Sequence, residues 1–261
     1  MAQPARRILV LAGHDPTGGA GVDADREAAL AHGVIADCVV TAETEQDGVR
    51  VSAIRPRDPA SWLEEARAWL REYGSRAPVV VKTGLLPGAA HVRALVEFAE
   101  GASDLTLVVD PVLAASGGET FLDEEGLSVL RRELLPLGPI LTPNLPETAR
   151  LVSRLPSEFD VLEQRVAAGE QLLEWGVRAA LIKGGHGEED PVRDLIVQRE
   201  QSPIWHEHPR VPGASLHGSG CRYASSVAAE LAKGSALDAA AKVAGRHLAA
   251  LLAQKPAGRN S

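Results

Sequence analysis

The sequence predicts an α/β protein with a mostly parallel central sheet, helices on both faces and a small antiparallel hairpin at one edge. Short apolar runs that stop at a glycine or a charged residue alternate with helical stretches, as in βα units. Several runs are wholly apolar, which is typical of strands buried on both faces. A polar turn between 192–197 and Ile204–His208 predicts the hairpin. We expect one domain over residues 1–261, with 255–261 as a loose tail.

The elements can be assigned in order along the chain. A strand over 8–12 stops at Gly13, a helix over 22–32 ends at Gly33, a suitable C-terminal cap, and 38–42 is the second strand. Asp58 and Pro59 begin a helix with one apolar face, on which we expect core residues at Trp62, Leu63, Ala66, Trp69, Leu70 and Tyr73. The later strands are 79–81, Leu105–Val109, 140–142 and Ala179–Ile182. The later helices are 90–98, 126–135, 146–155, 161–175, one from Gly220 to just before Gly234, and one with Ser235 as N-cap and Asp238 as capping-box partner.

Composition excludes several classes of protein. Acidic residues outnumber basic ones by 35 to 27, for a net charge of −8, whereas a nucleic-acid-binding surface needs a clustered basic face. The two cysteines, Cys38 and Cys221, are too few for a disulfide framework or a zinc site built on CxxC pairs. No apolar stretch reaches the ~18 residues of a membrane span. We therefore expect a cytoplasmic protein that binds neither nucleic acid nor membrane, although a locally positive site could still take a small anion.

Five motifs fall where predicted strands end, the edge at which open parallel sheets bind ligands. The first, the glycine-rich loop 13–21, lets backbone approach a ligand, but it lacks both the GxGxxG and the GxxxxGK[ST] pattern. The second places Asp110 at a strand end, where a turn or a cap would also explain it. The third places Asn144 and Glu147 at a strand-to-helix turn, and helix capping alone explains both.

The last two motifs point to an anion. Lys183, followed by glycines, suits a polyphosphate chain, although a lysine here could simply be solvated. The run His217-Gly218-Ser219-Gly220-Cys221 precedes an alanine-rich helix, whose free N-terminal amides would form an anion hole. The field of the helix favours the thiolate of Cys221, whereas a small buried hydrophobic cysteine is the alternative. The acidic run 187–190 is expected to be a solvated loop.

Together these motifs resemble, in the same order, those of the hydroxymethylpyrimidine/phosphomethylpyrimidine kinases of the ribokinase-like superfamily. The resemblance runs from about Arg7 to about Leu252, and its blocks are 13–25, 110–118, 142–147, 183–186 and 217–221. It implies a three-layer ribokinase-like sandwich, ATP and Mg²⁺ as cofactors, and a homodimer. The implied substrate is the hydroxymethyl group of 4-amino-5-hydroxymethyl-2-methylpyrimidine, in thiamine diphosphate biosynthesis. Whether the monophosphate is also a substrate stays open.

The resemblance also implies roles for individual residues. Cys221 would stand where the wider superfamily has a catalytic aspartate and would activate the substrate hydroxyl. The residues implied to hold the transferring phosphoryl group through their amides are Gly218, Ser219 and Gly220. Those implied at the pyrimidine are Asp25, Gln46, Gly13, Leu85 and Val112. Those implied at ATP are Lys183, Asn144 and Glu147, and those implied at Mg²⁺, partly through water, are Asp110 and Glu147.

Four residues depart from the family's pattern and add charge near the expected pocket. His14 replaces a small hydroxyl residue, Arg222 replaces a threonine, and Glu43 and Glu45 replace apolar or small residues. Because Glu43 and Glu45 alternate on a strand, they share a face. Either they form an ion pair with Arg222, or they disfavour an anionic second substrate.

Two other functions fit the same sequence. A pyridoxal kinase of the same fold would also phosphorylate a hydroxymethyl group on a flat nitrogen ring. A non-catalytic ligand sensor would keep the pocket and lose the chemistry. The intact set of Lys183, Asp110, Glu147 and Cys221 speaks against the sensor, whereas the four departures favour some drift.

Overall fold

The computed structural model describes residues 5–47, 50–75, 78–102, 104–115, 118–213 and 215–254. In these ranges the strands form one nine-stranded sheet in the order β3-β2-β1-β4-β5-β6-β7-β8-β9. The strands are β1 (Arg7–His14), β2 (Ile35–Gln46), β3 (Val51–Pro56), β4 (Val79–Thr83), β5 (Leu105–Val109), β6 (Ile140–Leu141), β7 (Ala179–Ile182), β8 (Val192–Gln198) and β9 (Ile204–His208). Pairing is parallel from β2 through β7 and antiparallel at both ends, so the expected α/β class is confirmed. The predicted tail, 255–261, lies outside the described residues.

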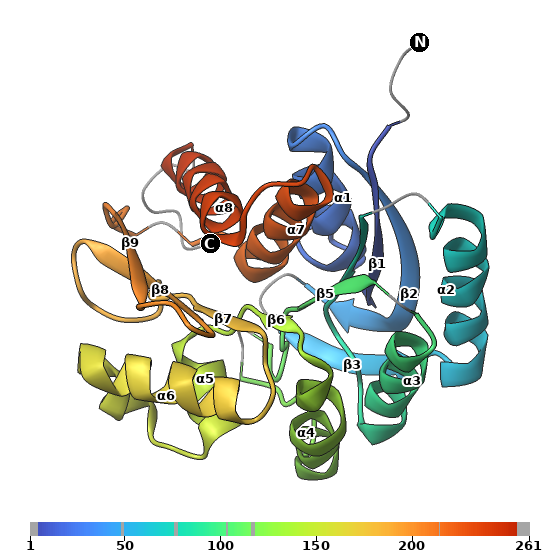
Figure 1. Ribbon diagram of the computed structural model, residues 1–261, viewed down its shortest axis with the longest axis horizontal. Coiled ribbons are helices and arrows are strands. Elements are labelled where there is room, and N and C mark those ends of the chain that lie inside the picture. The colour runs from blue at the N-terminus through green and yellow to red at the C-terminus, as the bar shows by residue number, and fades with distance from the viewer. Residues whose placement is uncertain are drawn as a thin grey trace.

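Helices cover both faces of the sheet and make three layers (Figure 1). On one face lie α1 (Gly21–Ala31), α7 (Ser219–Ala232) and α8 (Leu237–Ala253). On the other lie α2 (Pro59–Tyr73), α3 (Ala89–Glu100), α4 (Glu124–Val129), α5 (Leu145–Val152) and α6 (Leu162–Glu174). None of these helices, within the ranges described, has the length and apolar character needed to cross a membrane.

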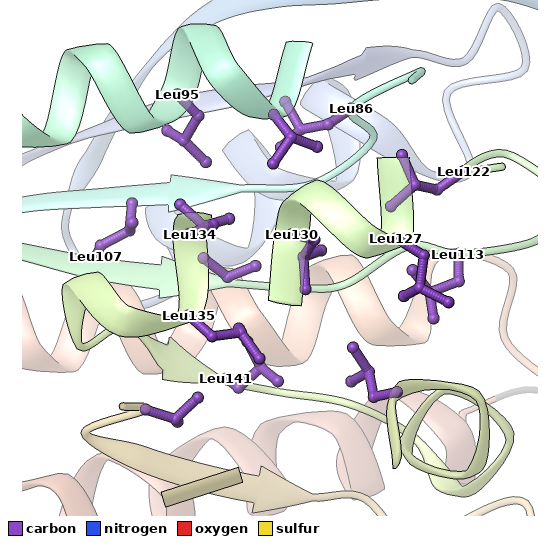
Figure 2. Packing of buried hydrophobic residues seen from close by; sticks show 14 of the residues in the cluster. Leu86, Leu95, Leu107, Leu113, Leu122, Leu127, Leu130, Leu134, Leu135 and Leu141 are labelled. Atoms are coloured by element: carbon purple, nitrogen blue, oxygen red, sulfur yellow. The ribbon is translucent and has the colours of Figure 1, made fainter. Parts of the chain in front are cut away.

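Two apolar clusters hold the layers together. Successive side chains of a strand point to opposite faces, so alternate residues of β1 enter different clusters. Ile8 and Val10 belong to the cluster beside α1 and α7. Leu9 and Leu11 belong to the cluster beside α2 and α3. The cluster that contains Leu9 and Leu11 is rich in leucine, and Figure 2 shows its side chains packed between helices and sheet. Of the two tryptophans predicted for the core, Trp62 is fully buried and Trp69 is partly buried.

The sequence missed the edge of the sheet next to β2. β2 extends from Ile35 to Gln46 instead of covering only 38–42, and β3 pairs with its second half. Beyond Ala42 the buried and exposed residues of β2 alternate, since one face of the edge hairpin is open to solvent. The apolar run that marks the buried half therefore stops before the strand does.

Two predicted helix ends are wrong. Ala236, not Ser235, is the N-cap of α8, because the Ser235 hydroxyl bonds to Glu230 at 3.1 Å and Asp238 pairs with His206 at 2.7 Å. The helix expected over 126–135 begins earlier, after an Asp123 cap, and its last part is a π-helical and 3₁₀ segment.

Candidate active site

The predicted motifs converge at the carboxyl edge of the parallel strands. β1 lies between β2 and β4, so the chain crosses over from one half of the sheet to the other beside β1. Ligands of open α/β sheets bind at such a switch point. Gly13 is the last residue but one of β1, which thus runs past the glycine at which it was expected to stop. Asp110 follows β5, Lys183 follows β7, and the first turn of α7 lies against these strand ends.

A lysine–aspartate pair lies directly under the start of α7. Lys183 Nζ is 3.1 Å from Asp110 Oδ1, which also accepts the Thr142 hydroxyl at 3.2 Å. A Cβ at Gly220 would lie 3.2 Å from Lys183 Nζ and 3.4 Å from Asp110 Oδ2, so a bare backbone lets the helix approach this pair. Burial opposes the charge of Lys183, but Asp110 and Glu147 outweigh it and raise its pKa. A fixed cation thus stands beside the first turn of α7, and the two together suit an anion, although the Ser219 amide in that turn already donates to the Leu216 carbonyl at 3.1 Å.

Asn144 and Glu147 form a capping box at the start of α5. The Glu147 amide donates to Asn144 Oδ1 at 2.8 Å, and the Asn144 amide donates to Glu147 Oε2 at 2.7 Å. Both side chains therefore cap the helix in the structure, as one of the two interpretations of this motif expected. Burial raises the pKa of Glu147 to about 7, Asp110 adds to the rise, and Lys183 opposes it.

Among the described residues, no three His, Cys, Asp or Glu side chains form a group that could hold a metal ion.

The acidic run after Lys183 is solvated only in part, since Glu188 and Asp190 are exposed and Glu189 is not. Glu189 accepts two hydrogen bonds from the buried Arg165, at 2.5 and 3.1 Å. Arg210 donates to the carbonyls of residues 185, 187 and 189. The segment that follows the lysine is thereby fixed to α6 on one side and to the chain after β9 on the other.

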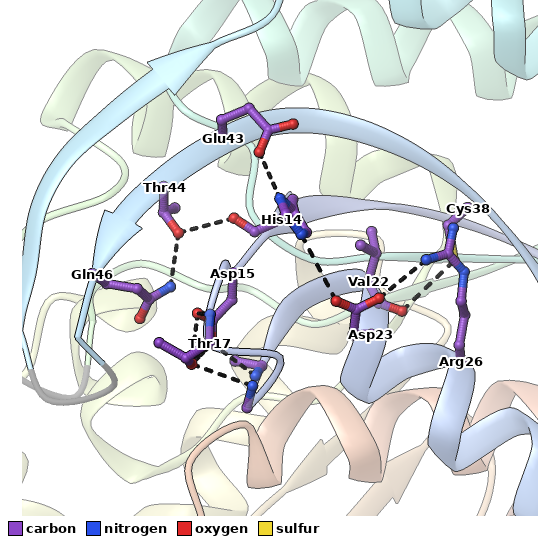
Figure 3. Close-up of polar contacts among 12 residues, drawn as sticks. His14, Asp15, Thr17, Val22, Asp23, Arg26, Cys38, Glu43, Thr44 and Gln46 are labelled. Atoms are coloured by element: carbon purple, nitrogen blue, oxygen red, sulfur yellow. Dashed lines mark hydrogen bonds and ion pairs between the residues drawn. The ribbon is translucent and has the colours of Figure 1, made fainter.

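Asp15 organises the glycine-rich loop, a role that the sequence analysis missed. Its nearly buried carboxylate accepts the amides of Thr17 at 2.8 Å and Ala20 at 2.9 Å, and lies 2.8 Å from His217 Nε2. Figure 3 shows the bonds around Asp15 and Thr17. The signal was present, since aspartate at the start of a Pro-Thr-Gly-Gly turn bonds to backbone two residues on. The loop is therefore joined to the segment that precedes α7.

Asn in place of Asp15 is expected to destabilise the protein more at neutral pH than at low pH. Burial opposes ionisation, but hydrogen bonds from Thr17, His217 and Ala20 lower the pKa of Asp15 overall. A carboxyl group whose pKa is lower in the folded state than in the unfolded state stabilises the protein above its unfolded-state pKa, which is about 3.9. This stabilisation is lost as the pH falls through the folded-state pKa. Urea unfolding of Asp15→Asn at about pH 7 and about pH 3 measures this difference. The exposed Asp104→Asn is the control, and an equal cost of Asp15→Asn at both pH values would contradict the assignment.

Arg222 is tied to the glycine-rich loop and not to the acidic strand. Its guanidinium donates to the Gly19 carbonyl at 2.7 Å, the His217 carbonyl at 3.0 Å and Glu27 at 2.6 Å. The predicted ion pair with Glu43 or Glu45 is wrong, because Arg222 faces α1 across the loop. Arg222 is thus a second link between the loop and the start of α7.

Ala in place of Arg222 is expected to lower the free energy of unfolding by about 1–3 kcal/mol, because two partly buried carbonyls lose a charged donor. Arg26→Ala is the matched control, since Arg26 forms an exposed pair with Asp23 on α1 and such pairs contribute ~0–1 kcal/mol. Urea unfolding compares the two variants. Equal losses would show that Arg222 is only a surface charge.

The acidic residues added near β2 each have a local partner. His14 Nδ1 lies 2.6 Å from Glu43 Oε2, and Glu45 pairs with Arg55 of β3. Gln46 donates to the Thr44 hydroxyl at 2.7 Å, which in turn donates to the His14 carbonyl at 2.9 Å (Figure 3). An open groove of about 760 Å³ lies here, lined by Pro16, Glu43, Thr44, Glu45, Gln46, Asp47, Arg50, Ser52 and Arg55.

The residues expected at the pyrimidine are not all in this groove. Gln46 lines it, whereas Gly13 and Leu85 contact each other at the end of β1, where a Cβ on Gly13 would lie 2.8 Å from Leu85 Cδ2. Val112 is partly buried beyond Asp110. Asp25 is fully buried behind them on α1. Gly13 and Leu85 therefore lie together, whereas Gln46, Val112 and Asp25 lie at other places.

The expected thiolate at Cys221 is wrong. Burial raises the pKa of this thiol to about 11, while Lys82 lowers it and Asp25 and Asp110 raise it further. Burial outweighs the helix field because the helix dipole contributes only ~0.3–1 kcal/mol. Cys221 is therefore a thiol at neutral pH, at the place where a thiolate had been predicted.

The fold, with helices on both faces of a mostly parallel sheet, defines a ribokinase-like class of protein. A crystal structure of phosphomethylpyrimidine kinase from Clostridium difficile 630 superposes with a TM-score of 0.78 at 26% identity, over 95% of this chain and 99% of that one. A pyridoxal kinase from Staphylococcus aureus, in complex with AMP-PCP, reaches 0.85 at 24% identity over 98% and 91%, which shows the fold alone. The family model described as phosphomethylpyrimidine kinase matches residues 15–260. The chain belongs to this family.

Curated relatives agree with this membership. A hydroxymethylpyrimidine/phosphomethylpyrimidine kinase from Streptomyces coelicolor is 37% identical over 238 residues, covering 91% of this chain and 85% of the relative. A thiamine biosynthetic bifunctional enzyme of Arabidopsis thaliana is 36% identical over 242 residues, covering 92% of this chain and 45% of the relative. The chain therefore spans about half the length of the bifunctional relatives.

Proposed function

We propose that the protein is an ATP-dependent kinase that phosphorylates the hydroxymethyl group of 4-amino-5-hydroxymethyl-2-methylpyrimidine in thiamine diphosphate biosynthesis. The observation that carries this proposal is the Lys183–Asp110 pair held against the bare first turn of α7. The hydroxyl oxygen attacks the γ-phosphorus, the bond from that phosphorus to the β,γ-bridging oxygen breaks with ADP as the leaving group, and the hydroxyl proton is released to solvent water. Catalysis then depends on positioning and on stabilising charge on the phosphoryl oxygens.

The residues at this edge each have a place in that reaction. Lys183 neutralises phosphate charge, with Asn144 and Glu147 beside it, and the amides of Gly218, Ser219 and Gly220 receive the transferring group. Cys221, one residue further on, positions the hydroxyl oxygen. Gly13, Leu85 and Val112 would form the apolar wall, and Asp25 and Gln46 would provide polar contacts to the ring.

The carboxylates of Asp110 and Glu147 fit Mg²⁺. Mg²⁺ prefers oxygen ligands and is commonly held by one or two carboxylates together with substrate phosphates and water. Asp110 adds to the raised pKa of Glu147, so the two carboxylates lie near enough to interact. When bound, Mg²⁺ would neutralise charge on the phosphates of ATP.

A substrate panel tests the function. The purified protein with Mg-ATP is given the pyrimidine alcohol, its monophosphate and pyridoxal, and phosphorylated product is measured for each. Turnover of the pyrimidine alcohol is expected. Turnover of pyridoxal but of neither pyrimidine would overturn the substrate assignment, and no stimulated transfer with any of the three would favour the sensor. The monophosphate arm answers whether a second phosphorylation occurs.

The homodimer, the single domain and the cytoplasmic location remain predictions. Analytical ultracentrifugation tests whether the protein is a homodimer.

A further inference from the structure

Arg222 carries a nearly buried guanidinium whose bonds go mainly to backbone. Its side chain is 8% exposed, and Nη1 donates to the Gly19 carbonyl at 2.7 Å and to the His217 carbonyl at 3.0 Å. Its other terminal nitrogen, Nη2, donates to Glu27, whose side chain is 59% exposed. One nitrogen thus joins the glycine-rich loop to the residue that precedes the N-cap of α7. We call these two carbonyl bonds the Arg222 clamp.

The two carbonyls belong to peptide groups that bear on the phosphoryl site. The C=O and N–H of a planar trans peptide point in opposite directions, so a fixed His217 carbonyl also fixes the Gly218 amide. Gly218 is the N-cap of α7, and its amide is one of those that the proposed reaction uses. The Gly19 carbonyl shares a peptide group with the Ala20 amide, which donates to Asp15 at 2.9 Å. That peptide group is therefore held at both of its polar atoms.

The turn of residues 218–220 lies between the Arg222 clamp and the lysine–aspartate pair. A Cβ on Gly218 would lie 2.9 Å from Arg222 Nη1, so the guanidinium packs directly on the bare N-cap. A Cβ on Gly220 would lie 3.2 Å from Lys183 Nζ, so the other end of the turn faces that cation. The Arg222 amide donates to the Gly218 carbonyl at 3.0 Å and begins the helix. The Arg222 side chain therefore lies over the turn that its own backbone closes.

We propose that Arg222 is a positioning residue of the phosphoryl site, which fixes the direction of the Gly218 amide and holds the glycine-rich loop against the first turn of α7. In this role the guanidinium acts through the carbonyls of His217 and Gly19 rather than on a substrate. Arg222 stands where the family's pattern has a threonine, so the clamp is a feature of this chain. The proposal rests on the proposed function in that the Gly218 amide receives the phosphoryl group.

Steady-state kinetics of Arg222→Met with Mg-ATP and the pyrimidine alcohol test the proposal. Methionine fills much of the same space and has no donor, so the Gly218 amide loses its fixed direction while Lys183 stays at the phosphates. We expect kcat to fall roughly tenfold or more, with the KM for ATP within about twofold of the parent. A merely structural role would lower kcat only as far as the folded fraction falls, which thermal unfolding measures. Glu27→Gln is the matched control, because it removes the charge at Nη2 and leaves both carbonyl bonds, and it should keep parental kcat.

Chemical rescue separates positioning from stability. In Arg222→Ala, methylguanidinium can enter the space that the side chain leaves and donate to both carbonyls, so we expect it to raise kcat toward the parental value. In Arg222→Met the side chain fills that space, and no rescue is expected. A guanidinium salt weakens apolar burial, so it would not restore activity lost through unfolding. Parental kcat in folded Arg222→Met, or a lowered kcat in Arg222→Ala that methylguanidinium does not raise, would overturn the proposal.

Hydrogen exchange needs no substrate and keeps this test separate from the kinase assignment. The Ala20 amide, bonded to Asp15, and the Ser219 amide, bonded to the Leu216 carbonyl, report on the loop and the turn. Both are expected to exchange about tenfold faster in Arg222→Met than in the parent, with α8 unchanged, and neither is expected to change in Glu27→Gln. If the substrate panel is negative, faster exchange confined to these two segments supports the clamp without the kinase, and parental exchange overturns it.

Discussion

Alanine in place of Gly218 is expected to lower kcat/KM for phosphoryl transfer by about 100-fold or more, the size associated with loss of an oxyanion donor. Gly218 is the N-cap of α7 and has a φ of +74°, which side chains disfavour. A Cβ there would lie 2.3 Å from the Gly19 carbonyl oxygen and 2.8 Å from Ala20 Cα. Because these are backbone atoms, the glycine-rich loop or the first turn of α7 must move, and the amides that receive the phosphoryl group move with it.

Gly245→Ala is the matched control for this substitution. Gly245 lies within α8, and no atom lies within 4 Å of its added Cβ, so activity should be unchanged and the helix slightly more stable. Steady-state kinetics with the pyrimidine alcohol, together with thermal unfolding, separate loss of the site from loss of the fold. A folded Gly218→Ala protein with parental kcat/KM would show that this turn does not form the phosphoryl site.

Replacing Cys221 by alanine is expected to lower kcat by roughly 10²-fold while leaving the KM for ATP close to that of the parent. The thiol stands at the third residue of α7, beside the pair Lys183 and Asp110 that we place at the phosphates. Its loss would release the hydroxyl oxygen of the substrate, whereas the phosphate contacts stay in place. Initial rates at varied ATP and varied pyrimidine measure the two effects separately.

Cys38→Ala is the control for the loss of a thiol. Cys38 lies on β2, and burial raises its pKa to about 12, so it is also a thiol at neutral pH, but it lies outside the proposed phosphate site. Its variant should keep parental kcat. Equal turnover by Cys221→Ala and the parent would remove Cys221 from the mechanism.

The sequence was sufficient to predict the class of fold and the meeting of Asp110 and Lys183 at one edge of the sheet. Apolar strands and helical stretches alternate regularly, and each polar motif follows a strand, so parallel topology alone brings Asp110 and Lys183 together although they are 73 positions apart. The unpredicted parts depend on pairings between elements that share no local pattern. Lys82 and Asp25, 57 positions apart, meet only because β4 lies next to β1 and α1 packs on the same face.

Competing effects of different size explain the other errors. At Cys221 the helix field and burial act in opposite directions, and only the structure shows how deeply the thiol is buried. At Arg222 the choice of partner depends on which side of α7 faces the glycine-rich loop. Neither the depth of burial nor the rotation of a helix can be obtained from residue spacing near the end of a helix.

The antiparallel strands at both ends of the sheet also bear on self-association. An open sheet leaves an unpaired row of backbone groups on β3 and on β9, and such rows can recruit a strand from another molecule. β3 ends in Arg55 and Pro56, while β9 carries Glu207 bonded to Arg193 and His206 bonded to α8. Charged side chains, proline and a neighbouring helix are features that block strand addition. The sheet is therefore protected at both edges against growth into aggregates.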